Sequence, residues 1–149
     1  MQAHKYHAFL KKRECETKMI SEKLSKRLLL VNIIFAITAI LIERAGISLK
    51  MYVYANTSFH VFGVPLIIIG GWMIIGHASW VVFKKLGWIA GLSMGIIIDL
   101  PLEFLAFHLG WWTWNPSMAP IFFNAPLANF LVYLSVGFGS ILTHKYVMK

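Results

Sequence analysis

The sequence predicts an all-α integral membrane protein with four transmembrane helices. Three observations support this fold class. First, 58% of the 149 residues are hydrophobic and the mean hydropathy is +0.69, which is more apolar than an ordinary soluble domain. Second, four apolar stretches are each long enough, or nearly so, to cross a bilayer. Third, the basic residues gather at the ends of these stretches. We therefore expect a membrane domain over residues 28–149, preceded by a basic segment over residues 1–27.

The first predicted span covers Leu28–Ile42 and extends past Glu43, because about 20 residues are needed to cross the apolar core. The basic segment before it is long for a signal peptide, and no small-residue cleavage site follows Ile42 closely. We therefore expect this first helix to be retained. The spacing of apolar residues in the basic segment predicts an amphipathic helix lying on the anionic inner leaflet. A solvated, partly disordered tail is the alternative.

Three further spans are predicted at Val61–Phe83, Leu86–Leu109 and Leu127–Thr143. Lys84 and Lys85 form a short turn between the second and third spans. Pro116, Pro120 and Pro126 disfavour a regular helix before the fourth span. No internal repeat is evident in the sequence.

The basic residues also predict the orientation of the chain. Twelve of the 14 lysines and arginines lie before the first span, between the second and third, or after the fourth. Only Arg44 and Lys50 lie on the other side. Under the positive-inside rule both termini are cytoplasmic, which predicts a multi-pass protein of the cell membrane. The same distribution argues against nucleic-acid binding despite the net charge of +8. The single cysteine, Cys15, excludes an internal disulfide.

Three acidic residues mark the candidate site. Asp99 and Glu103 lie within the third apolar stretch, and Glu43 closes the first. Ionisable groups are costly at bilayer depth, so these positions indicate function. Asp99 and Glu103 are four residues apart and share one helix face. Two neighbouring carboxyls in an apolar setting cannot both ionise cheaply, so the pair can supply an acid and a base together. Pro101, between them, predicts a local kink in the helix.

Other readings of these residues remain open. The carboxyls could have a purely structural role, with Arg44 or Lys50 pairing with Glu43. A metal ion could in principle be held by Asp99, Glu103, His60 and His108. However, Asp99 and His108 fall on opposite helix faces, and no ligand pair occurs at useful depth. We therefore predict neither a metal nor a cofactor. His60, His77, His108, Asn124 and Asn129 also fit ordinary packing and interhelical hydrogen-bonding roles.

Aromatic residues are dense in the two predicted outer loops. Tyr52 and Tyr54 lie in the first loop and Trp112 and Trp114 in the second. Such residues usually form the interfacial belt of a membrane protein.

These residues form an ordered set of motifs. The first half carries Glu43-Arg-Ala-Gly46, Tyr52-Val-Tyr54 and Phe62-Gly-Val-Pro-Leu66, followed by Trp72. The second half carries Asp99-Leu-Pro-Leu-Glu103, Gly110-Trp-Trp-Thr-Trp114 and Pro126-Leu-Ala-Asn-Phe130. In this order they resemble the carotenoid biosynthesis membrane protein family, which includes the carotenoid and bisanhydrobacterioruberin hydratases. The chain resembles a shortened form of that family over about Glu43 to Phe138.

The resemblance implies a cofactor-independent hydratase that adds water to the terminal double bond of an acyclic carotenoid or isoprenoid. It implies that Asp99, Glu103 and Glu43 are catalytic. It also implies that the substrate is bound by aromatic residues and one asparagine, namely Tyr52, Tyr54, Trp72, Trp112, Trp114 and Asn129. This chemistry needs an acid, a held water and walls such as Trp faces that stabilise a cation.

The alternative is a small non-catalytic subunit of a multi-subunit membrane enzyme complex. Glycines at Gly63, Gly70, Gly71, Gly87, Gly91 and Gly95 offer close-packing surfaces for such a role. The expected partners are therefore a membrane lipid or carotenoid, together with further copies of the chain or other membrane subunits.

Overall fold

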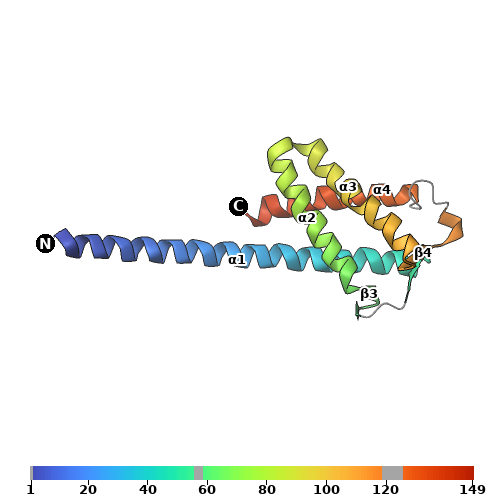
Figure 1. Ribbon diagram of the computed structural model, residues 1–149, viewed down its shortest axis with the longest axis horizontal. Helices are drawn as coiled ribbons and strands as arrows, with labels where there is room; N and C mark the ends of the chain where they lie inside the picture. The colour runs from blue at the N-terminus through green and yellow to red at the C-terminus, as the bar shows by residue number, and fades with distance from the viewer. Residues whose placement is uncertain (1, 56–58, 119–125) are drawn as a thin grey trace.

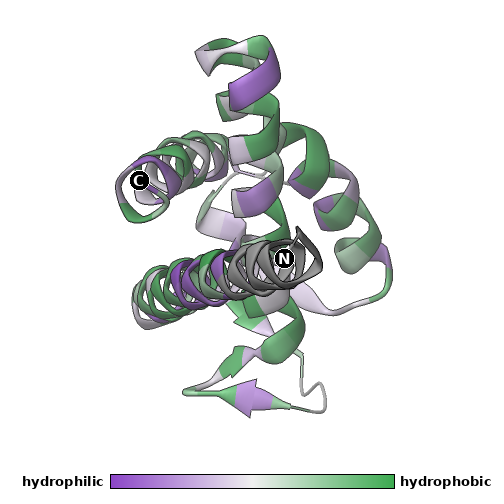
Figure 2. Cartoon of the chain, turned by 90° about the vertical axis from the view of Figure 1, so that its left-hand side faces the viewer, coloured by the Kyte–Doolittle hydropathy of each residue, from purple (hydrophilic) through white to green (hydrophobic). Residues whose placement is uncertain are grey.

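Four long helices make up most of the chain in this computed structural model, which describes residues 2–55, 59–118 and 126–149 (Figure 1). They are α1 (Gln2–Ser48), α2 (Leu66–Leu86), α3 (Trp88–His108) and α4 (Leu127–Val147). Each contains a stretch long and apolar enough to cross a membrane, and in α1 this stretch lies within Glu16–Ser48. Large apolar side chains are exposed along all four helices, and the cartoon in Figure 2 shows hydrophobic residues along much of the helices. The prediction of four helices suited to a membrane is confirmed.

The basic N-terminal segment is part of α1. It continues the axis of the first span and projects away from the other helices (Figure 1). Within the described residues, this segment forms neither a separate helix lying on the membrane surface nor a disordered tail, which were the two predictions for it. The first glycine is Gly46 and the first proline Pro65, so nothing in this segment breaks the helix. Arg27 meets the bundle by donating a hydrogen bond from Nη1 to the carbonyl oxygen of Met148, over 3.2 Å.

Glycines allow the helices of the bundle to approach closely. A Cβ on Gly95 would lie 2.6 Å from the carbonyl oxygen of Tyr133 in α4. A Cβ on Gly91 would lie 2.7 Å from the Cβ of Phe83 in α2. These two glycines, predicted as possible surfaces for a partner subunit, are therefore used for packing within the chain. Gly70, Gly71 and Gly87 have open space beside them.

Two short strand pairs lie at one end of the bundle, which we call the strand end. Strand β1 (Tyr52–Tyr54) pairs antiparallel with β4 (Trp112–Trp114), with Val53 opposite Thr113. This pairing joins two loops that are far apart in the sequence. A single 3₁₀ turn, η1 (Pro116–Met118), follows β4. Both pairs add strands that the all-α prediction lacked.

The second strand pair corrects the predicted start of the second span. Strands β2 (His60–Val61) and β3 (Val64–Pro65) form a hairpin, so Val61–Pro65 lies outside the helix. Phe62 and Gly63 at the turn have positive φ values of 52° and 78°. Positive φ at both central residues suits a tight hairpin turn, and Pro65 then caps the start of α2.

The two halves of the chain correspond to one another, which corrects the expectation that there is no repeat. Residues of α1 and β1 match residues of α3 and β4 that lie 60 positions later, and residues of α2 match those of α4 that lie 61 later. Glu43 corresponds to Glu103, Tyr52 to Trp112, Tyr54 to Trp114, Pro65 to Pro126, Trp72 to Tyr133, Gly76 to Gly137 and Ser79 to Ser140. The β1–β4 register agrees, because Tyr52 faces Trp114 and Tyr54 faces Trp112. Few of the matched positions carry the same amino acid. The repeat is therefore visible only when matched residues are seen to occupy corresponding places in the helices and strands and to make corresponding contacts.

A row of hydrogen-bonded polar side chains links three helices at a place away from the strand end. Nδ1 of His77 lies 3.0 Å from Nε2 of His144, and Nε2 of His77 lies 2.8 Å from Oδ1 of Asn32. His144 also donates from Nδ1 to the carbonyl oxygen of Ser140. These bonds tie α1, α2 and α4 together. His77 therefore has the packing role that the sequence favoured for it, and His144 is its partner in that role.

Candidate functional site

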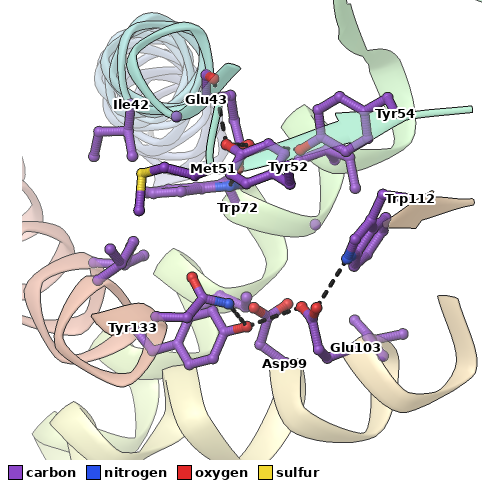
Figure 3. Close-up of a pocket in the computed structure, with 18 of the residues that line it drawn as sticks. Ile42, Glu43, Met51, Tyr52, Tyr54, Trp72, Asp99, Glu103, Trp112 and Tyr133 are labelled. Atoms are coloured by element: carbon purple, nitrogen blue, oxygen red, sulfur yellow. Dashed lines mark hydrogen bonds between the residues drawn. The ribbon is translucent and has the colours of Figure 1, made fainter. Parts of the chain in front are cut away.

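A cavity of about 280 Å³ lies beneath the β1–β4 pair at the strand end (Figure 3). All nine residues predicted for the site line it. They are Glu43, Tyr52, Tyr54, Trp72, Asp99, Glu103, Trp112, Trp114 and Asn129. The remaining lining is largely apolar and includes Ile42, Met51 and Val136. Residues from all four helices and both paired strands thus meet around one space.

Glu43 is held by three donors from the first half of the chain. The hydroxyls of Tyr52 and Tyr54 each donate to its Oε2 over 2.5 Å, and Nε1 of Trp72 donates to its Oε1 over 2.8 Å. The carboxyl group is buried, with Glu43 only 8% exposed. Three donors directed at one buried carboxylate replace the water that it loses, and such charge-assisted bonds are each worth about 1.5–3 kcal/mol. Glu43 therefore anchors β1 and α2 to the end of α1.

Tyr52 and Tyr54 remain donors because of their surroundings. Burial raises the pKa of both hydroxyls above the ordinary tyrosine value, and the nearby Glu43 carboxylate raises each pKa further. Each hydroxyl therefore keeps its proton well beyond neutral pH. Both hydroxyls can therefore donate to Glu43 across the whole physiological range.

Glu103 has the matching arrangement in the second half. Nε1 of Trp112 donates to its Oε1 over 2.8 Å, and Nε1 of Trp114 donates to the same oxygen. The hydroxyl of Tyr133 donates to Oε2 over 3.1 Å. Glu103 is 3% exposed, so its carboxyl is the more deeply buried of the two. The two tryptophans thus direct N–H groups at Glu103, a role that the expectation of a wall of ring faces did not include.

Tyr133 connects the remaining polar groups of the cavity. Its hydroxyl lies in hydrogen-bond contact with Asp99 as well as with Glu103, and it accepts a bond from Nδ2 of Asn129 (Figure 3). Sequence reasoning missed this residue. Two signals could have found it: Tyr133 lies one helical turn after Asn129, and it corresponds to Trp72 in the other half.

Asp99 and Glu103 lie on one face of α3, as predicted, and both reach the cavity. Helix α3 continues through Pro101, which lies on the exposed side of the helix. Among the described side chains, neither Arg44 nor Lys50 pairs with Glu43, and the ion pair found is that of Lys26 with Glu22. The structural alternative based on those two cations is therefore wrong. Among the described residues, no lysine, arginine or histidine lines the cavity.

The residues weighed as metal ligands do not come together. Within residues 16–55, 59–118 and 126–149, no three side chains of His, Cys, Asp or Glu are grouped as a metal site requires. His60 lines a separate hollow beside β1 and β4. His108 contacts the carbonyl oxygen of Phe104 on its own helix, with 2.8 Å between them. Asn124 lies outside the described residues.

Comparison with family models, with curated proteins and with solved structures finds no match to this chain.

Proposed function

We propose that the protein is a cofactor-independent hydratase of the cell membrane that adds water to the terminal double bond of an acyclic carotenoid or isoprenoid. A carboxylic acid in the cavity transfers its proton to the less substituted carbon of the double bond. A tertiary cation forms at the other carbon. A water oxygen then bonds to that carbon and gives up a proton to a carboxylate. The sum is one alkene and one water giving one tertiary alcohol, with no change in redox state.

The observation that carries this proposal is the pair of carboxyls Asp99 and Glu103, joined through Tyr133 in an apolar, aromatic-lined cavity. A carboxylic acid that keeps its proton in such a setting can act as a general acid, and the carboxylate it leaves behind can act as a base. Anionic and aromatic neighbours favour a cation. The described part of the lining has no lysine or arginine to supply a competing charge or a competing nucleophile.

The proposed substrate is a lipid because the cavity lies within a bundle whose outer surface is apolar. A long hydrocarbon chain can reach the acids from the bilayer without crossing water. Its reacting end would occupy the cavity, and the rest would extend between or beside the helices. A volume of about 280 Å³ suits the end of such a chain rather than its full length.

Expression in a host that makes acyclic carotenoids tests the activity. We expect pigments whose mass has increased by one water, in membranes that contain the protein. Long acyclic isoprenoids without a polyene serve as a second substrate set. If the protein is verified in the membrane and no substrate of either set gains one water, the hydratase is wrong.

We further propose that both termini face the cytoplasm, so that the strand end lies on the outer side of the membrane. The division of basic residues supports this orientation. In a Cys15→Ser background, a membrane-impermeant thiol reagent added outside intact cells should label Lys50→Cys and leave Lys85→Cys unlabelled. The opposite pattern, or labelling of both positions, would exclude the orientation.

A further inference from the structure

The internal repeat separates the three acids of the cavity into two kinds. Glu43 and Glu103 occupy matching positions, and each accepts bonds from two aromatic side chains of a strand and one of a helix. The position that corresponds to Asp99 in the first half is Ala39. The matched pair thus belongs to the architecture that both halves share. Asp99 has no such counterpart.

The surroundings of Asp99 are also specific to the second half. Its neighbours Asn129 and Tyr133 correspond to Ile68 and Trp72. Beyond the matched glutamates and their donors, the second half therefore adds a carboxyl, an amide and a hydroxyl to the cavity, whereas Ile68 in the first half is apolar. Protonation of a carbon–carbon double bond needs these added polar groups, which only the second half provides.

The hydrogen bonds of Tyr133 decide which acid carries a proton. Its hydroxyl has one hydrogen to donate and accepts a bond from Asn129, yet it faces two carboxyl groups, Asp99 and Glu103. Two ionised carboxylates would compete for that single hydrogen. One of the two acids must therefore supply a hydrogen of its own.

Glu103 is the poorer candidate to hold that hydrogen. It already accepts two indole N–H groups, which donate only, together with the Tyr133 hydroxyl. Three donors favour the ionised form of a carboxyl. In the described part of the chain, Asp99 has Tyr133 alone as a hydrogen-bond partner. Every group is satisfied when Asp99 donates to Tyr133 and Tyr133 donates to Glu103.

We infer that Asp99 is the single protonated carboxyl of the cavity and the proton donor of the proposed hydration, while Glu43 and Glu103 are ionised positioning residues. The catalytic part of this inference rests on the proposed function. Asp99 gives its proton to the alkene carbon and becomes a carboxylate. That carboxylate then takes the proton released by the attacking water, so one residue completes the cycle. Glu103 holds Tyr133, and through it Asp99, in place.

Infrared spectroscopy of the full chain in lipid tests the location of the proton without requiring any turnover. Three of the six carboxyl side chains of the sequence, Glu43, Asp99 and Glu103, line the cavity. We expect one carbonyl band of a protonated carboxylic acid. It should vanish in Asp99→Asn and persist in Glu43→Gln, the control for removing a buried carboxyl. In Tyr133→Phe it should shift in frequency but remain, because only its hydrogen-bond acceptor is lost.

Absence of the band in the unchanged protein would overturn the inference, as would its persistence in Asp99→Asn or its loss in Glu43→Gln. These outcomes are distinct from failure of the proposed function. A protein with the Asp99 band that adds water to no isoprenoid would retain the proton assignment and lose the hydratase. A protein that hydrates without the band would retain the activity and lose the assignment.

Discussion

Asp99→Asn is expected to reduce hydration of an acyclic carotenoid by at least about 100-fold, the low end of what a positioned general acid contributes. The substitution keeps the shape of the side chain and its contact with Tyr133, but it removes the proton that the alkene must receive. The measurement is the fraction of pigment that has gained one water, per amount of protein in the membrane.

The control for this experiment is a substitution that leaves the acid in place. Ile42→Val removes one methylene from the apolar lining of the same cavity and should leave most of the activity. Equal losses in the two variants would indicate that the cavity merely needs its shape. Full activity in Asp99→Asn would assign the proton donor elsewhere and remove the basis of the mechanism.

Gly95→Ala is expected to destabilise the protein, because α3 and α4 are in backbone contact at this point. The added Cβ would lie 2.6 Å from the carbonyl oxygen of Tyr133, which cannot rotate away as a side chain could. Overpacking of this kind costs about 1–3 kcal/mol. The resulting shift of α4 would also move the Tyr133 hydroxyl away from Asp99 and Glu103, so activity should fall together with stability.

Gly70→Ala provides the matched control, because it also places a methyl group on a helical glycine. Apart from the neighbouring backbone of its own helix, no described atom lies within 4 Å of a Cβ added at Gly70. Alanine is favoured over glycine in a helix by about 1 kcal/mol, so this variant should be as stable as the parent or more so. Thermal unfolding midpoints in the same detergent compare the two. A midpoint for Gly95→Ala equal to that for Gly70→Ala would show that the contact is looser than described.

The helices and the site residues could be predicted because both depend on local patterns. Apolar length predicts the spans, and carboxyls within an apolar stretch are rare enough to indicate a site on their own. The aromatic residues Tyr52, Tyr54, Trp112 and Trp114 drew attention by their density. All four of these residues line the cavity.

What could not be predicted depends on contacts between distant segments. The β1–β4 pair joins residues about 60 positions apart, and a strand of three residues has almost no periodicity of its own. The predicted second span includes residues 61–65 of the hairpin, because Val61 and Val64 are as apolar as the helix that follows. Tyr133 looks like one more aromatic residue of a membrane helix until Glu103 and Asp99 are placed beside it.

The position of Asp99 in a small cavity has a consequence for a substrate with two identical ends. Only the second half of the chain offers Asp99, and its counterpart in the first half is Ala39. A cavity of about 280 Å³ also receives one end of a long polyene at a time. The two ends of such a molecule would therefore react in separate encounters, with release and rebinding in between. The proposed hydratase would then be distributive, and the singly hydrated molecule would be a free species in the bilayer, open to any enzyme that accepts its unreacted end.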